Sequence, residues 1–230
     1  MPDPNELEFS KEETKQLYEL TKLYPKVKEL ILYSEEVDTE HSTYGQTVNE
    51  LRNSMDHLMR LFAVKFGFKD ENPEYSKKNL DKAFGHVYRA GYDSLDLLNV
   101  SIRERIIYEL NGISSDTIYK IFPEYYREIK PNLEKISKEI SDVRLDKDVA
   151  GNEVQSSNFK NFENYIQLVR NLKDSLDKTI DIKPSLIEYE NKKEKESKKK
   201  ERRELLIRIG LVIISVVGTA LLALILSYGN

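Results

Sequence analysis

Apolar residues recur along most of this chain at intervals of three and four, the spacing that places them on one side of an α-helix. No segment of convincing length alternates between apolar and polar residues as a half-buried strand does. The 230 residues include only 9 Gly and 7 Pro, few turn formers for a many-stranded fold. The pattern therefore predicts an all-α protein whose helical bundle occupies residues 1–182.

Capping and breaking residues divide this pattern into separate helices. Ser10 and Glu13 form a capping box that predicts the start of the first helix, and Pro25 is expected to begin a second one. The further predicted helices span residues 39–66, 74–110, 124–145 and 158–180, with a short helix capped by Ser115 and interrupted by Pro123. Residues 67–73 and 146–157 are predicted loops, and Asn111 and Gly112 a helix stop. Pro131 is expected to bend its helix or to lie in the first turn, and Pro184 to begin a charged helix.

The last strongly apolar segment is long enough to cross a membrane. Ile209 to Leu226 is an uncharged run of 18 residues, and a bilayer core of about 30 Å needs roughly 20 helical residues. A buried helix of a soluble protein is the alternative, but such helices usually keep a polar stripe, whereas Leu, Ile and Val occupy every face here. We therefore expect a single transmembrane helix over residues 205–228, preceded by a charged stalk over 183–208.

Flanking charge predicts the orientation of this helix. Residues 192–208 contain nine Lys or Arg and four Glu, a net charge of +5, although the whole chain carries −4. The positive-inside rule then places the N-terminal domain in the cytoplasm, at the inner face of the cell membrane, and the polar N-terminus lacks the features of a signal peptide. A nucleic-acid-binding arm is less favoured, because the segment adjoins the predicted span. The residues expected to contact anionic lipid head groups are Lys198, Lys199, Lys200, Arg202 and Arg203.

Several kinds of chemistry lack their sequence signatures. The chain has no Cys, which excludes disulfides and thiolate metal sites. It also lacks the His-x-x-x-His and Glu-x-x-His spacings of helical metal sites, and the glycine patterns of nucleotide-binding loops and serine hydrolases. We therefore predict neither a metal nor a cofactor.

Two of the three histidines, His57 and His86, lie on long predicted helices among other polar residues. At about 100° per residue, the most apolar stripe of the 39–66 helix is predicted to face the core; its members are Leu51, Met55, Leu58 and Phe62. The opposite face, predicted to point outward, carries Arg52, Asn53, Asp56, His57 and Arg60. On the 74–110 helix the predicted core stripe is Leu80, Phe84, Val87, Gly91, Leu95 and Leu98. The residues His86, Arg89 and Asp93 lie off that stripe.

The spacing Arg52-Asn53-x-x-x-His57 resembles the motif of the HEPN superfamily, whose members are helical bundles. Many of them are metal-independent endoribonucleases of prokaryotic defence and toxin–antitoxin systems. The resemblance covers about residues 10–145. It implies that His57 acts on the 2′-hydroxyl or the leaving group, that Arg52 binds the scissile phosphate and that Asn53 orients the pair. It also implies that the motifs of two copies meet at a dimer interface.

Several functions stay open at this point. The resemblance implies a membrane-anchored effector or accessory protein of a bacterial antiphage defence system, which would assemble through Asp56, Arg60, His86, Arg89 and Asp93 and cut RNA or damage the membrane. Its partners would be the bilayer, further copies of the chain, and RNA or another defence protein. The alternatives are a membrane-anchored adaptor without chemistry, in which these residues only solvate a helix face, and a sensor that binds an anionic ligand between Arg52 and Arg89.

Overall fold

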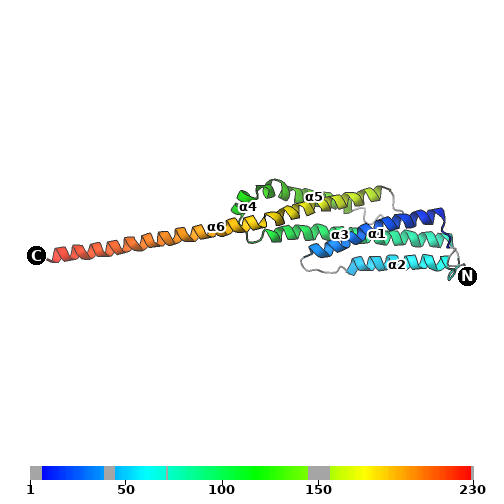
Figure 1. Cartoon of the computed structure of the whole chain (residues 1–230), viewed down its shortest axis with the longest axis horizontal. Helices are drawn as coiled ribbons and strands as arrows, with labels where there is room; N and C mark the ends of the chain where they lie inside the picture. The colour runs from blue at the N-terminus through cyan, green and yellow to red at the C-terminus, as the bar shows by residue number, and fades with distance from the viewer. Residues whose placement is uncertain (1–6, 39–44, 71, 145–155, 229–230) are drawn as a thin grey trace. The chain divides into compact units, whose positions relative to one another are not determined.

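In a computed structural model the chain is helical almost throughout the part that the structure describes, which confirms the predicted fold class (Figure 1). That part consists of residues 7–38, 45–70, 72–144 and 156–228, with side chains for all of these except 143–144, 156–159 and 220–228. The chain divides into two compact units: Met1–Asn111 with Glu124–Asp181, and Gly112–Pro123 with Ile182–Asn230.

Helix α1 (Lys11–Val37) opens the first unit. The predicted capping box is present: the Glu13 N–H donates to Ser10 Oγ at 3.2 Å, and the Ser10 N–H donates to Glu13 Oε2 at 2.8 Å. The expected second helix at Pro25 is wrong, because α1 continues through this residue. The buried side chains Leu20, Leu23 and Val27 stay in phase on both sides of the proline, so packing of this stripe outweighs the cost of the missing N–H.

Helices α2 (Gly45–Lys65) and α3 (Pro73–Glu109) follow. The predicted start of α2 at residue 39 lies outside the described residues. Asn72 caps α3 through its side chain, which accepts from the Tyr75 N–H at 3.1 Å. Both α1 and α2 pack against α3 (Figure 1). The core stripe predicted for α3, from Leu80 to Leu98, is buried throughout.

The centre of the first unit is an aromatic cluster between α3 and the first part of α6 (Ser156–Tyr228). Tyr88, Tyr92, Phe162 and Tyr165 have no exposed surface, and the rings of Tyr88 and Tyr92 lie 5.4 and 5.3 Å from that of Phe162. Gly91 allows this approach, because a Cβ at this position would lie 2.7 Å from Phe162 Cζ. Each buried tyrosine also needs a partner for its hydroxyl. Tyr88 donates to Tyr92 at 3.1 Å and Tyr165 to Asp96 at 2.7 Å.

The segment after Pro123 forms a π-helical turn, η1 (Tyr125–Ile129), followed by α5 (Lys130–Arg144). Pro131 lies in the first turn of α5, which was one of its two expected positions. Its ring would press on the carbonyl four residues earlier in a regular helix. The wider turn, in which the Lys130 N–H bonds to the Tyr125 carbonyl five residues back, relieves that contact. The predicted loop over 146–157 lies largely outside the described residues.

Helix α6 has 73 residues and contributes to both units. The predicted break at Pro184 is wrong, because the helix continues through it. Proline removes the hydrogen bond to the carbonyl of Ile180, but Ile180 is 42% exposed, so water can replace the missing donor.

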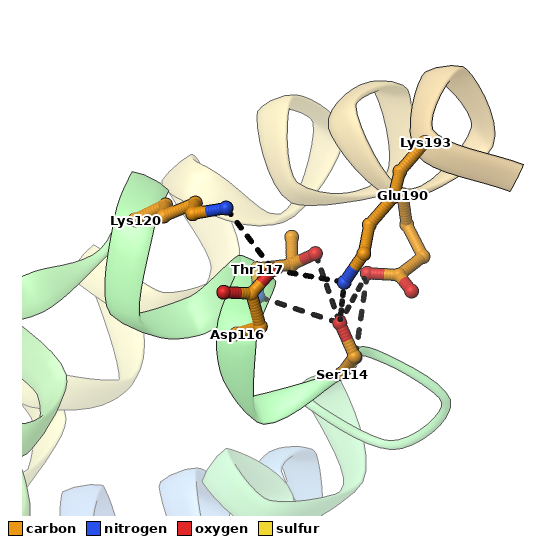
Figure 2. Close-up of polar contacts among 6 residues, drawn as sticks. All are labelled: Ser114, Asp116, Thr117, Lys120, Glu190 and Lys193. Atoms are coloured by element: carbon orange, nitrogen blue, oxygen red, sulfur yellow. Dashed lines mark hydrogen bonds and ion pairs between the residues drawn. The ribbon is translucent and has the colours of Figure 1, made fainter. Parts of the chain in front are cut away.

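The second unit joins helix α4 (Ser115–Ile121) to α6 through a polar cluster, shown in Figure 2. Ser114, rather than the predicted Ser115, is the N-cap of α4 and accepts from the Thr117 N–H at 3.3 Å. Ser114 Oγ donates to Glu190 Oε2 at 2.9 Å, while Lys193 Nζ lies 2.9 Å from Asp116 Oδ2. The hydrogen bonds from Lys193 and Lys120 lower the pKa of Asp116, and those from Thr117 and Ser114 lower the pKa of Glu190.

Loss of the cap should therefore loosen α4. Ser114→Ala removes both the cap and the bond to Glu190, and we expect the opening free energy of α4 to fall by about 0.5–2 kcal/mol. Hydrogen exchange of the α4 amides in the full-length protein measures this change. Ser115→Ala is the matched control, since Ser115 is exposed, and equal effects of the two variants would contradict the assignment of Ser114 as the cap.

Candidate functional site

Three polar contacts join α2 to α3 and are the densest polar grouping around the predicted site. Ser54 Oγ donates to the Ala83 carbonyl at 2.9 Å, His57 Nδ1 lies 2.8 Å from Asn79 Oδ1, and His86 Nδ1 lies 2.7 Å from Glu50 Oε2. The residue numbers of the partners decrease along α3 as those on α2 increase, as antiparallel neighbours require. These contacts therefore define the register of the two helices.

His57 is held by its neighbours rather than presented to solvent. Its exposed fraction is 9%. Because Asn79 Nδ2 donates to the Tyr75 carbonyl at 2.8 Å, the Asn79 oxygen faces the imidazole as an acceptor. This network assigns a proton to Nδ1, which donates to the Asn79 oxygen.

His86 stacks on His57 with ring centroids 5.3 Å apart and an interplanar angle of 14°. Arg89 lies on the same side of α3, with Nε 3.1 Å from Glu50 Oε2 and Nη2 2.7 Å from His86 Nδ1. Burial is the main cause that lowers the pKa of His86; Arg89 and His57 act in the same direction, and Glu50 opposes them. The ring is therefore neutral at pH 7 although a carboxylate touches it.

The structure corrects the predicted orientation of α2. Met55 is 57% exposed and Leu51 half-buried, whereas Ser54, His57 and Leu61 are buried. The predicted core stripe of Leu51, Met55, Leu58 and Phe62 is thus wrong, since none of the four is buried, and His57 does not point outward. The helix is turned by roughly a quarter of a revolution relative to the prediction. The reason is that α3 offers polar partners to the side of α2 that carries Glu50, Ser54 and His57.

The three residues of the HEPN-like motif do not form one constellation. Arg52 is exposed and Asn53 half-buried, while His57 lies in the interface with α3. Arg52 makes no hydrogen bond or ion pair with another residue in the described part of the chain. The other predicted residues of α2, Asp56 and Arg60, form an exposed ion pair at 2.6 Å. Of the predicted site residues, the structure brings together His57, His86 and Arg89.

The grouping also contains residues that were not predicted from the sequence, namely Glu50, Ser54 and Asn79. A usable signal exists in the sequence, because Glu50 and His57 are seven residues apart on one helix and Asn79 and His86 are seven apart on the next. Two equal spacings of about two helical turns match when the helices run antiparallel. Each polar residue then meets one on the other helix.

The members of the grouping contact one another, and neither of two open cavities in the first unit includes a predicted site residue. One, of about 460 Å³, lies between Ser10, Lys65 and Ser76; the other, of about 570 Å³, lies between α1 and α6. Within the described residues, no group of three or more His, Asp or Glu could hold a metal ion.

The predicted lipid-contacting residues lie on an exposed part of α6. Lys198, Lys199, Lys200, Arg202 and Arg203 are all exposed, and Lys198 pairs with Glu194 at 2.5 Å. Over the residues that the structure describes, no helix has both the length and the apolar character needed to cross a bilayer. The predicted span reaches beyond the last described side chain, at residue 219.

Comparison with known proteins adds no relative. No protein-family model matches the chain, and no curated protein or solved structure is significantly similar to it.

The lowered pKa of His86 makes the stability of the first unit depend on pH. The unfolded chain binds a proton near the ordinary value of about 6.5, whereas the folded protein does so only at lower pH. As far as this group decides it, the free energy of unfolding is therefore highest above pH 6.5. It decreases as the pH falls below 6.5, by at most about 1.4 kcal/mol per pH unit. Denaturant unfolding of the full-length protein between pH 8 and 5 measures it. His86→Gln should flatten the profile, and an unchanged slope in this variant would refute the assignment.

Proposed function

We propose that this chain is a membrane-anchored adaptor whose helical bundle lies in the cytoplasm and binds other proteins without catalysing a reaction. The observation that carries the proposal is the surface of α6 after the stalk. Ten large apolar side chains from Leu205 to Val217 are each 47–69% exposed. They lie on all sides of the helix, so a single packed neighbour could not cover them, whereas lipid surrounds a helix completely.

The flanking sequence supports a span at this place. The uncharged run continues to Leu226, which provides about the length that a bilayer core requires. The cationic segment 192–208 directly precedes it, as expected for a helix whose preceding domain stays in the cytoplasm. Glu194 and Lys198 pair at 2.5 Å one turn apart, the type of contact that supports an exposed helical stalk.

The position of His57 favours an adaptor over a ribonuclease. A general acid or base must reach the proton that it transfers, but His57 is 9% exposed and bonded to Asn79. Arg52, which would bind the scissile phosphate, lies on a different side of α2. Membership of the HEPN superfamily, RNA cleavage and a role in defence stay predictions from the sequence.

The membrane proposal predicts integral association with lipid. Full-length protein synthesised in the presence of vesicles containing anionic lipid should float with them and resist alkaline extraction. Ile213→Arg/Val216→Arg should abolish this, because each Arg costs about 2.5–3.5 kcal/mol near the centre of a span. Tyr108→Arg/Tyr119→Arg is the control, since these side chains are 59 and 61% exposed elsewhere. Extraction of the wild-type protein by alkali would contradict the membrane proposal.

The adaptor proposal also predicts an absence of nuclease activity. Wild-type protein and Arg52→Ala/His57→Ala should leave a mixed RNA pool equally intact without divalent metal. Gel electrophoresis of the pool reads the result. Cleavage by the wild type that the double variant lacks would establish a ribonuclease and overturn the non-enzymatic assignment.

A further inference from the structure

The outer side of α2 carries a row of apolar side chains, three of which are at least half exposed. Val48, Met55 and Met59 are 50, 57 and 50% exposed. Leu51 and Phe62 are half-buried and continue the row; the Phe62 ring also lies 6.3 Å from the rings of Phe9 and Phe66. Single exposed apolar residues are ordinary on a protein surface, but five along one side of one helix form a continuous strip, which is typical of a binding surface. We call these five residues the α2 strip.

The spacing of the α2 strip is the same in both directions. Its members are separated by three, four, four and three residues, with Met55 at the centre. A two-fold interface brings the same surface of two copies together, so each residue meets its symmetry counterpart. Antiparallel pairing about Met55 would place Val48 opposite Phe62 of the second copy and Leu51 opposite Met59. Met55 would face its own counterpart, so every member of the strip has an apolar partner.

The charges beside the α2 strip suit the same arrangement. Arg52 is exposed and has no ion-pair partner within the described residues, and Asp56 is held by Arg60 at 2.6 Å. In an antiparallel pair the same edges of the two helices meet. Arg52 of each copy then falls opposite residue 58 of the other, about 3 Å along the axis from Asp56. Each Asp56 would lie between its own Arg60 and the other copy's Arg52, so two carboxylates are surrounded by four guanidinium groups.

From this symmetry we infer that α2 is a homodimer interface, in which the α2 strips of two copies pack antiparallel about a two-fold axis at Met55. The apolar strip supplies the attraction, and the exposed Arg–Asp edge, worth little in energy, selects the antiparallel register. A contact formed by one 21-residue helix is smaller than a standard interface of roughly 1,600 Å². The pair should therefore dissociate in the micromolar range in detergent.

Cross-linking tests the geometry directly, because the chain has no cysteine of its own. In full-length protein in detergent, Met55→Cys should form a disulfide-linked dimer on mild oxidation, since the axis brings the two Cβ atoms together. Tyr18→Cys, 58% exposed on α1, should not. Val48→Cys should cross-link to Phe62→Cys in a mixture of the two variants, but not to itself. Self-linking of Val48→Cys would indicate parallel pairing and overturn the proposal.

Sedimentation velocity provides the second test. Met55→Glu should raise the dimer dissociation constant at least about tenfold, a loss of about 1.4 kcal/mol. Arg52→Glu should raise it by a smaller factor, and Tyr18→Glu should leave it unchanged. Because Met55 is exposed, these variants keep the helical content of the wild type, which circular dichroism verifies. A wild-type protein that stays monomeric at 100 μM, or a dimer that survives Met55→Glu, would refute the inference.

Discussion

The polar contacts between α2 and α3 fix the rotation of α2 about its own axis, and the character of its outer surface follows from that rotation. Glu50, Ser54 and His57 each find a partner on α3. Turning α2 so that Met55 and Met59 were buried would gain about 1.5–3 kcal/mol for each side chain. It would also separate at least six polar groups on the two helices, and each that stayed buried without a partner would cost about 1–3 kcal/mol. The same turn would expose Leu61 and Val64, which are now buried. The apolar gain is thereby offset, and the three polar contacts favour the orientation in which the apolar strip faces outward.

This orientation links the fold to the two proposals. His57, held by Asn79 and stacked on His86, joins two helices, so the residue that most resembles a catalytic group is part of the packing. The same rotation leaves Val48, Met55 and Met59 in solvent, where a second copy can cover them. The apolar side chains of α6 are also exposed, and we propose that a bilayer covers them. In both places an uncovered apolar surface indicates what the protein contacts.

The features that were predicted correctly from the sequence depend on residues that lie close together in the chain. The Ser10–Glu13 capping box and the core stripe of α3 depend on residues within a few turns of one another, and both are confirmed. Prediction failed where distant residues decide the outcome. Pro25 and Pro184 are common helix breakers, yet packing and solvent access let both helices continue. The rotation of α2 depends on Asn79, Ala83 and His86 of another helix, whereas the apolar pattern of α2 alone favours the opposite choice. The matching seven-residue spacings of Glu50 with His57 and of Asn79 with His86 contained that information.

The rotation of α2 is the central claim, and cysteine labelling measures it most directly. Met59→Cys and Val64→Cys would each be introduced into the full-length protein and treated with a maleimide at nanomolar concentration, where the chain is monomeric. Met59 is 50% exposed and Val64 is 5% exposed, so the account predicts that Met59→Cys reacts nearly as fast as in the denatured chain and that Val64→Cys is protected. The reverse order, with Met59→Cys protected and Val64→Cys reactive, would show that α2 buries its apolar strip and would contradict the account.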